Sequence, residues 1–141
     1  MKRGWAGLFV FWVVVALAAG PGDQARRLLE LSGVKGGLVV HIGCGDGRLT
    51  AALRASPAFL VHGLDRDPAN VRKARAHIRS LGLYGPVSVE RWTGGRLPYA
   101  DNLVALIVAS DPGDLADAEV MRVLRPGGVA CTRNNGQWKK V

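Results

Sequence analysis

The fold is decided by the stretch Val39-Val40-His41-Ile42-Gly43-Cys44-Gly45-Asp46-Gly47-Arg48-Leu49-Thr50. The apolar residues 38–42 that lead into the glycines include several β-branched side chains, which predicts a buried strand. Glycines then alternate at positions 43, 45 and 47, and a helix is expected from residue 48 onward. A strand that turns at glycines into a helix presents backbone N–H groups and the positive end of the helix dipole. We therefore expect a polar or negatively charged ligand to approach this loop closely.

The spacing of the glycines narrows the class of ligand. A dinucleotide site has the pattern G-x-G-x-x-G, whereas Arg48 occupies the place of the third glycine in this chain. The pattern G-x-G-x-G after a hydrophobic strand resembles motif I of the class I S-adenosylmethionine-dependent methyltransferases. That resemblance implies S-adenosyl-L-methionine as the cofactor, with the loop around its methionine end. The alternative is a glycine-rich turn that binds no ligand.

An acidic residue follows the second expected strand, residues 59–64. Asp65 lies 18 residues beyond Gly47, close to the spacing of about 20 residues at which an acid bonds ribose hydroxyls in α/β folds. A helix cap is the alternative role, but Asp67 directly precedes Pro68 and is the better cap. The resemblance implies cofactor-binding positions at His41, Gly43, Cys44, Gly45, Gly47, Asp65, Arg66, Trp92 and Thr93, the last three of which would border the adenine.

Strands and helices alternate along the rest of the chain, which predicts a doubly wound α/β domain with a mostly parallel sheet. Strands are expected at 38–42, 59–64, 87–92, 103–109 and 128–132. Helices are expected at 23–32, from 48 to about 55–57, at 68–81 and at 115–124. Two segments also resemble the family, Leu97-Pro98-Tyr99 and Arg125-Pro126-Gly127-Gly128. The resemblance implies a Rossmann-like three-layer sandwich of strand order 3-2-1-4-5 over residues 23–133.

Three features depart from the family pattern. His41 stands where the family usually has an acid that helps to hold the ammonium group of the cofactor, and Thr93 stands where an acid usually contacts the adenine amino group. The chain also ends soon after the fifth strand, so we expect it to lack the C-terminal antiparallel hairpin, with residues 134–141 as a tail or the start of a missing continuation. A fragment is one explanation; the other is a partner that covers the edge. The layout also resembles the N-terminal module of large bacterial proteins that continue into β-propeller repeats.

Residues 1–20 differ in character from the remainder. Lys2 and Arg3 precede an uncharged apolar run, and Ala16-Leu17-Ala18 offers the small residues of a cleavage site. This is the layout of a secretory signal peptide, and the uncharged span is also close to the length of a membrane anchor. Either reading predicts an extracytoplasmic domain, periplasmic or membrane-anchored. A misassigned start codon would instead leave the domain in the cytoplasm, where S-adenosylmethionine is made.

Composition excludes a disordered chain, since 48% of the 141 residues are hydrophobic and 21% are charged. The net charge of +8 invites nucleic acid as a partner. The basic residues are dispersed, however, so solvated helix faces are the favoured explanation.

The cysteines and histidines predict neither a disulfide nor a metal site. The strand order places one strand between Cys44 and Cys131, or roughly 9.6 Å, beyond the roughly 7 Å that a disulfide spans. His77 is expected on a helix surface, without a second ligand at metal spacing.

The sequence therefore predicts a methyltransferase that uses S-adenosylmethionine and acts on an unknown acceptor. Asp111, after the fourth strand, is placed for an acceptor-side role, although a turn-forming Asp before Pro112 is the simpler explanation. No catalytic residue is assigned. The alternative is a non-catalytic exported module that packs against a downstream domain such as a β-propeller. The oligomeric state stays open.

Overall fold

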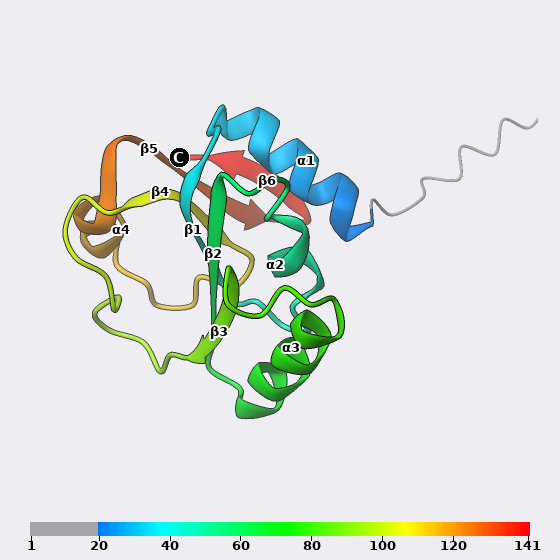
Figure 1. The fold of residues 1–141 in the computed structure, drawn as a ribbon. Coiled ribbons are helices and arrows are strands. Elements are labelled where there is room, and N and C mark those ends of the chain that lie inside the picture. Colours follow the sequence, from blue (N-terminus) through cyan, green and yellow to red (C-terminus); the bar gives the residue numbers. More distant parts are fainter. Residues whose placement is uncertain (1–19) are drawn as a thin grey trace, which may run out of the picture.

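A computed structural model describes residues 20–141 of the chain (Figure 1). Within these residues a six-stranded sheet has the order β3-β2-β1-β4-β5-β6. The strands are β1 (Gly37–Ile42), β2 (Phe59–Asp65), β3 (Val87–Arg91), β4 (Val104–Ala109), β5 (Leu124–Asn134) and β6 (Gln137–Lys140). The helices are α1 (Pro21–Ser32), α2 (Arg48–Ala52), α3 (Pro68–Ser80) and α4 (Asp117–Val123). The predicted α/β class and the order 3-2-1-4-5 are confirmed.

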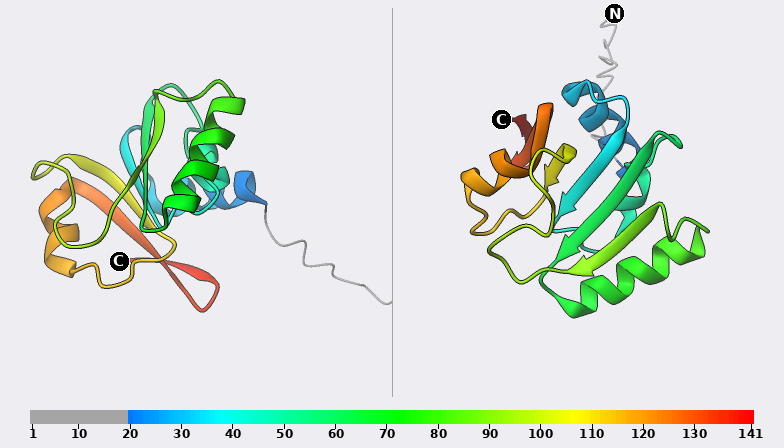
Figure 2. Two further views of the ribbon diagram at one scale, coloured as in Figure 1. Left: turned by 90° about the horizontal axis from the view of Figure 1, so that it is seen from below. Right: turned by 60° about the vertical axis from the view of Figure 1, so that its left-hand side comes forward.

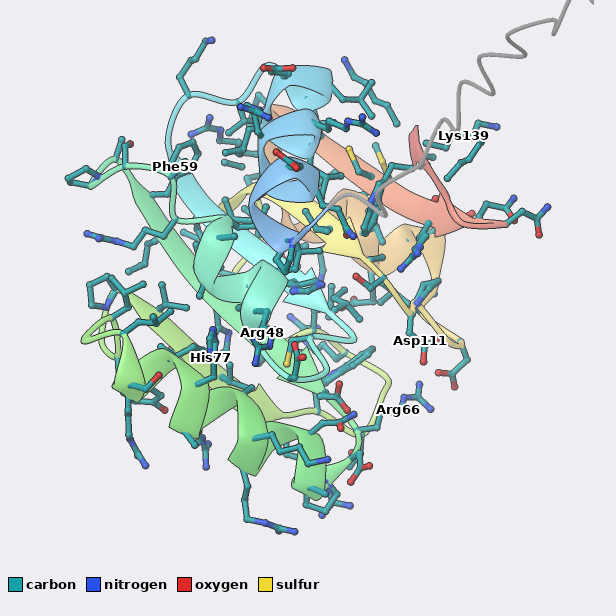
Figure 3. The ribbon with its side chains drawn as sticks, turned by 90° about the vertical axis from the view of Figure 1, so that its right-hand side faces the viewer. Arg48, Phe59, Arg66, His77, Asp111 and Lys139 are labelled. Carbon is teal, nitrogen blue, oxygen red and sulfur yellow. The ribbon has the colours of Figure 1, made fainter. Side chains whose placement is uncertain are left out.

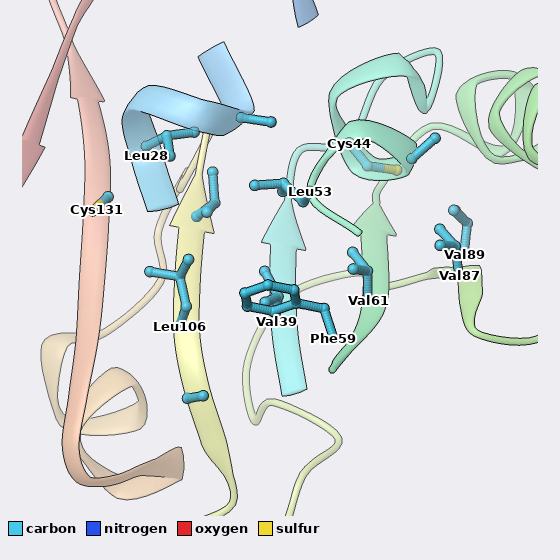
Figure 4. Close-up of a cluster of buried hydrophobic side chains, with 14 of the residues drawn as sticks. Leu28, Val39, Cys44, Leu53, Phe59, Val61, Val87, Val89, Leu106 and Cys131 are labelled. Carbon is cyan, nitrogen blue, oxygen red and sulfur yellow. The ribbon is translucent and has the colours of Figure 1, made fainter. Parts of the chain in front are cut away.

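Helices cover both faces of the sheet, as the views in Figure 2 show. On one face α1 packs against β5 and β6, α2 against β2, and α3 against β2 and β3. Leu28, Ala51 and Ala74 bring these helices into one core with the strands. Figure 4 shows this larger cluster, in which Val39, Val61 and Leu106 project from three neighbouring strands. The opposite face is covered by α4 and by the segment that follows β3, through residues such as Trp92, Leu97 and Val123.

The centre of the sheet is parallel and fully buried. All six residues of β4 are buried, as expected for a parallel strand with helices on both sides. β1 pairs in parallel with β2 on one side and β4 on the other. The carboxyl ends of these three strands therefore meet at one edge. The chain runs from β1 to β2 on one side and later crosses from β3 to β4 on the other side of β1, so the strand order reverses at this point. Open α/β sheets bind ligands in the crevice at such a point.

The end of the sheet corrects one prediction. The chain does not lack an antiparallel hairpin: β6 pairs with β5 in antiparallel register, from Cys131 opposite Lys140 to Asn134 opposite Gln137. The two connecting residues, Asn135 and Gly136, both have positive φ, 49° and 77°. Asn-Gly is the preferred pair for a two-residue turn of this kind. Residues 137–140, which we expected in a tail, thus form the last strand.

The fifth strand also begins earlier than expected. The fifth strand was expected at 128–132, after the Arg-Pro-Gly segment, but β5 already starts at Leu124, opposite Val104. The register then shifts, so that Val129 lies opposite Leu106. Gly128 makes this close pairing feasible, because a Cβ there would lie 2.9 Å from the carbonyl oxygen of Val104. The preceding helix α4 therefore ends at Val123, one residue before the expected end, and it starts at Asp117 and not at residue 115.

The predicted signal peptide or anchor, residues 1–20, lies almost entirely outside the described residues, and it stays a prediction. Among residues 20–141, none of the helices is both long enough and apolar enough to cross a membrane. Cys44 and Cys131 are buried free thiols, and β4 lies between their strands, as the predicted order requires.

Candidate functional site

A cavity of about 380 Å³ opens at the carboxyl edge of the sheet, where β1, β2 and β4 end. Its volume falls within the roughly 300–1,000 Å³ of typical small-molecule sites. Loops after β1, β2, β3 and β4 all contribute to its wall. The lining residues are Ile42, Gly43, Gly45, Leu64, Asp65, Arg66, Asp67, Asn70, Trp92, Asp111 and Gly113.

The three glycines of the loop are required for three different reasons. All have positive φ, between 56° and 80°. A Cβ on Gly43 would lie 2.8 Å from the backbone nitrogen of Asp111, and a Cβ on Gly47 would lie 2.8 Å from the Cα of Ala74. These two glycines therefore allow the loop to pack against its neighbours. Gly45 lines the cavity and a Cβ there would meet no protein atom within 4 Å, so this position leaves space for a ligand.

Most amides of the loop are bonded within the protein. The N–H groups of Gly43 and Cys44 both donate to the carbonyl of Leu64, at 2.8 and 3.1 Å, and that of Gly47 donates to Cys44 at 3.0 Å. The amide of Gly45 donates to the carboxylate of Asp65 at 2.9 Å. The N–H groups that we expected to be free for a ligand thus donate to acceptors within the protein. Polar recognition of a ligand therefore depends largely on the Asp65 carboxylate.

Asp65 is the most constrained polar group at the cavity. Its side chain faces the glycine loop through Oδ2, while Oδ1 accepts from the amide of Asp67 at 2.9 Å and from Nδ2 of Asn70 at 3.3 Å. Only 8% of the residue is exposed. A carboxylate offers about four acceptor positions, so three protein donors leave capacity for a ligand hydroxyl. The arrangement holds a buried negative charge ready to bind a hydrogen-bond donor.

His41 lies behind the loop and not on the cavity wall. Its Nδ1 is 2.8 Å from Oγ1 of Thr50 and its Nε2 is 2.7 Å from Oγ of Ser110. Burial lowers the pKa of His41 to about 4, against an opposing effect of the Asp65 charge. The imidazole is therefore neutral at physiological pH, and it ties the end of β1 to α2 and to the loop after β4.

The remaining predicted residues divide between the cavity and its surroundings. Arg66 and Trp92 both line the cavity, and the guanidinium carbon lies 5.7 Å from the centre of the indole ring. Cys44 is packed in the core, where burial, followed by the Asp65 charge, raises its thiol pKa to about 12. Thr93 is exposed and does not contribute to the cavity wall.

Sequence reasoning missed several polar residues of the site. Asn70 follows from no spacing rule that we applied, although it lies on the first turn of α3, facing Asp65. Thr50 and Ser110 come from segments 60 residues apart and meet only at His41. Asp114 forms an ion pair with Arg66 that local sequence does not reveal. Across residues 20–141 there is no group of three His, Cys, Asp or Glu side chains that could hold a metal ion.

The sheet order, the glycine loop after β1 and the buried acid after β2 define a nucleotide-type cofactor-binding domain of the Rossmann-like class. Residues 39–128 match the family model described as a methyltransferase domain. The chain belongs to the class I S-adenosylmethionine-dependent methyltransferases.

Individual relatives agree with this assignment. The chain is 32% identical over 112 residues to methyltransferase GfsG of Streptomyces halstedii, covering 75% of this chain and 40% of that protein. It is 33% identical over 116 residues to ribosomal protein L11 methyltransferase of Anoxybacillus flavithermus, covering 81% and 37%. Among solved structures, a geranyl diphosphate methyltransferase in complex with S-adenosylmethionine gives a TM-score of 0.69 at 25% identity, covering 79% and 48%.

These matches cover only part of each relative. The chain spans about 40% of the length of the curated relatives that it matches. The family match, residues 39–128, includes the glycine loop and the residues that line the cavity. Two of these relatives are named for unlike acceptors, ribosomal protein L11 and geranyl diphosphate.

Proposed function

We propose that the chain binds S-adenosylmethionine in the cavity at the carboxyl edge of the sheet and transfers its methyl group to an acceptor nucleophile. The observation that carries the proposal is the buried Asp65 carboxylate, held by Gly45, Asp67 and Asn70 against the glycine loop. The family membership supports the same cofactor.

The residues present fit an adenosyl ligand. The open space at Gly45 lets the ligand approach the backbone, where a side chain would intrude into the cavity. Asp65 retains acceptor capacity for ribose hydroxyls, and the indole of Trp92 contributes an aromatic surface for a planar base. The cofactor would therefore be held by Asp65 at the ribose, by Trp92 and Arg66 near the adenine, and by the Gly43–Gly45 turn near the methionine.

Bound S-adenosylmethionine would supply a methyl group on a sulfonium. The acceptor lone pair would form the new bond, the electron pair of the carbon–sulfur bond would go to sulfur, and the acceptor proton would leave to water. The contribution of this chain is positioning, which alone accelerates such displacements greatly. Its rigid loop, with Gly43 packed on Asp111 and His41 fixed between Thr50 and Ser110, holds the site in one geometry. Asp111 lines the cavity from the β4 side, where an acceptor would enter.

Isothermal titration of the full chain with S-adenosylmethionine tests the proposal, with Asp65→Asn and Asp65→Ala as variants. A charge-assisted hydrogen bond contributes about 1.5–3 kcal/mol, so each variant should bind about 10- to 100-fold more weakly. Asp46→Asn is the matched control, because Asp46 is exposed, does not line the cavity and uses its carboxylate to accept from the amide of Arg48. No binding to the wild-type chain, or equal binding by Asp65→Ala, would remove the proposed site.

A further inference from the structure

One side chain crosses the mouth of the cavity. Arg66 directly follows β2, and its guanidinium forms an ion pair with Asp114 in the segment after β4. In the sheet β1 separates these two strands, so the pair spans about two strand spacings, ~10 Å. The glycine loop leaves β1 between them. In Figure 3 Arg66 lies close to Asp111, in the segment that carries Asp114.

The surroundings of Arg66 are shaped to receive it. A Cβ on Gly94 would lie 3.1 Å from the terminal nitrogen Nη2 of Arg66, and a Cβ on Gly113 would lie 3.2 Å from the same atom. Both glycines have positive φ, 105° and 56°. The indole of Trp92 lies beside the guanidinium. Loops after β2, β3 and β4 therefore converge on a single side chain, and all three contribute to the cavity wall.

The ion pair is exposed at both ends. The side chains of Arg66 and Asp114 are 49% and 76% exposed, and exposed pairs of this kind add little to folding stability. The Arg66 guanidinium beside Asp114 lowers the pKa of that carboxyl, so the pair stays charged at neutral pH. A weak pair in this place opens readily, which suits a contact that has to break when a ligand enters or leaves.

We propose that Arg66 and Asp114 form a strap over the cavity, in which Asp114 is a positioning residue that holds Arg66 closed over bound S-adenosylmethionine. The inference rests on the proposed function, because the strap is assigned to the same cavity. Cofactor should enter while the pair is open and be retained while it is closed. The exposed pair is weak on its own, whereas in the complex Arg66 also contacts the bound adenosyl group, so closure is favoured after binding. The strap therefore governs the dissociation rate constant more than the association rate constant.

Stopped-flow tryptophan fluorescence of the full chain with S-adenosylmethionine measures both constants. Asp114→Asn should raise the dissociation rate constant about two- to fivefold, the range expected for an exposed ion pair, and leave association nearly unchanged. Asp114→Glu, which keeps the charge, should restore slow dissociation. Asp23→Asn is the matched control, since Asp23 forms an exposed ion pair with Arg26 on α1, away from the cavity.

Two further measurements separate the strap from a general effect of charge. S-Adenosylhomocysteine lacks the sulfonium charge. A strap predicts that Asp114→Asn raises the dissociation rate constant of this compound by the same factor, whereas simple attraction between Asp114 and a cation predicts no increase. In an Arg66→Ala background, Asp114→Asn should add nothing. Binding with unchanged dissociation in Asp114→Asn, or an equal effect of that substitution without Arg66, would overturn the strap and leave the proposed function standing. A wild-type chain that binds neither compound would overturn both.

Discussion

Acidification should destabilise the fold through His41. The side chain is 2% exposed and both ring nitrogens are engaged, by Thr50 and Ser110. Burial lowers its pKa from 6.5 to about 4. Between these values the unfolded chain binds a proton at His41 that the folded chain does not, so the free energy of unfolding falls as the pH falls.

The size of the effect follows from the shift. Each pKa unit corresponds to 1.36 kcal/mol, so the full shift amounts to about 3 kcal/mol, of which about 2 kcal/mol develops between pH 6.5 and pH 5. That loss is a substantial part of the roughly 5–15 kcal/mol that stabilises a typical domain. His62 contributes in the same direction, because burial lowers its pKa as well.

Urea unfolding at half-unit steps from pH 7.5 to pH 5 measures the dependence, above the range in which most carboxylates titrate. His41→Gln retains a donor and an acceptor without a titrating group, and it should remove about 2 kcal/mol of the pH-dependent loss. His62→Gln is the matched control for the second buried histidine. If His41→Gln and the wild-type chain lose stability in parallel over this range, the assigned pKa of His41 is wrong.

Three further substitutions test the loop and the hairpin. Gly47→Ala should destabilise the fold by about 2 kcal/mol or more, because the new Cβ would lie 2.8 Å from the Cα of Ala74 and the φ of +80° disfavours a side chain. Urea unfolding measures this loss, and a cost below about 1 kcal/mol would contradict the packing of the loop against α3. Gly45→Ala should lower the free energy of unfolding by only about 1–2 kcal/mol, through backbone strain. Calorimetry should show S-adenosylmethionine binding at least about tenfold weaker, and an unchanged affinity would show that the ligand lies elsewhere. Gly136→Ala should loosen the end of β6, because the φ of +77° at this position disfavours a side chain. Amide hydrogen exchange around Trp138 should become faster, and exchange as slow as in the wild-type chain would contradict the turn assignment.

The central strands and α3 could be predicted because their signals are local. The residues of β4 are aliphatic throughout, and a short run of this kind is typical of a parallel strand buried on both faces. Asp67 caps α3 as predicted, accepting from the amide of Ala69 at 2.8 Å. The β5–β6 hairpin was also within reach, since Asn135-Gly136 is a strong turn signal. It was missed because the expected fold ended at the fifth strand.

The contacts that shape the site could not be predicted from local sequence. The glycine spacing identifies a loop, but only the packed structure shows that Gly43 faces Asp111 and that Gly47 faces Ala74. The partners of His41 lie on different elements, so the sequence could not show that both ring nitrogens are occupied. Long-range contacts of this kind depend on how the helices and strands pack.

His41 stands where the family pattern has an acid, and this difference changes how the site must hold its cofactor. Within residues 20–141, Asp65 is the only buried carboxylate, and its charge is coupled to position 41. A second acid there would place two like charges near each other in a poorly solvated site, which raises the pKa of one of them. A neutral His41 removes that repulsion, but it also removes a negative partner for the cofactor ammonium group. Cofactor affinity should therefore depend more heavily on Asp65 and on closure of Arg66 than in relatives that keep the acid.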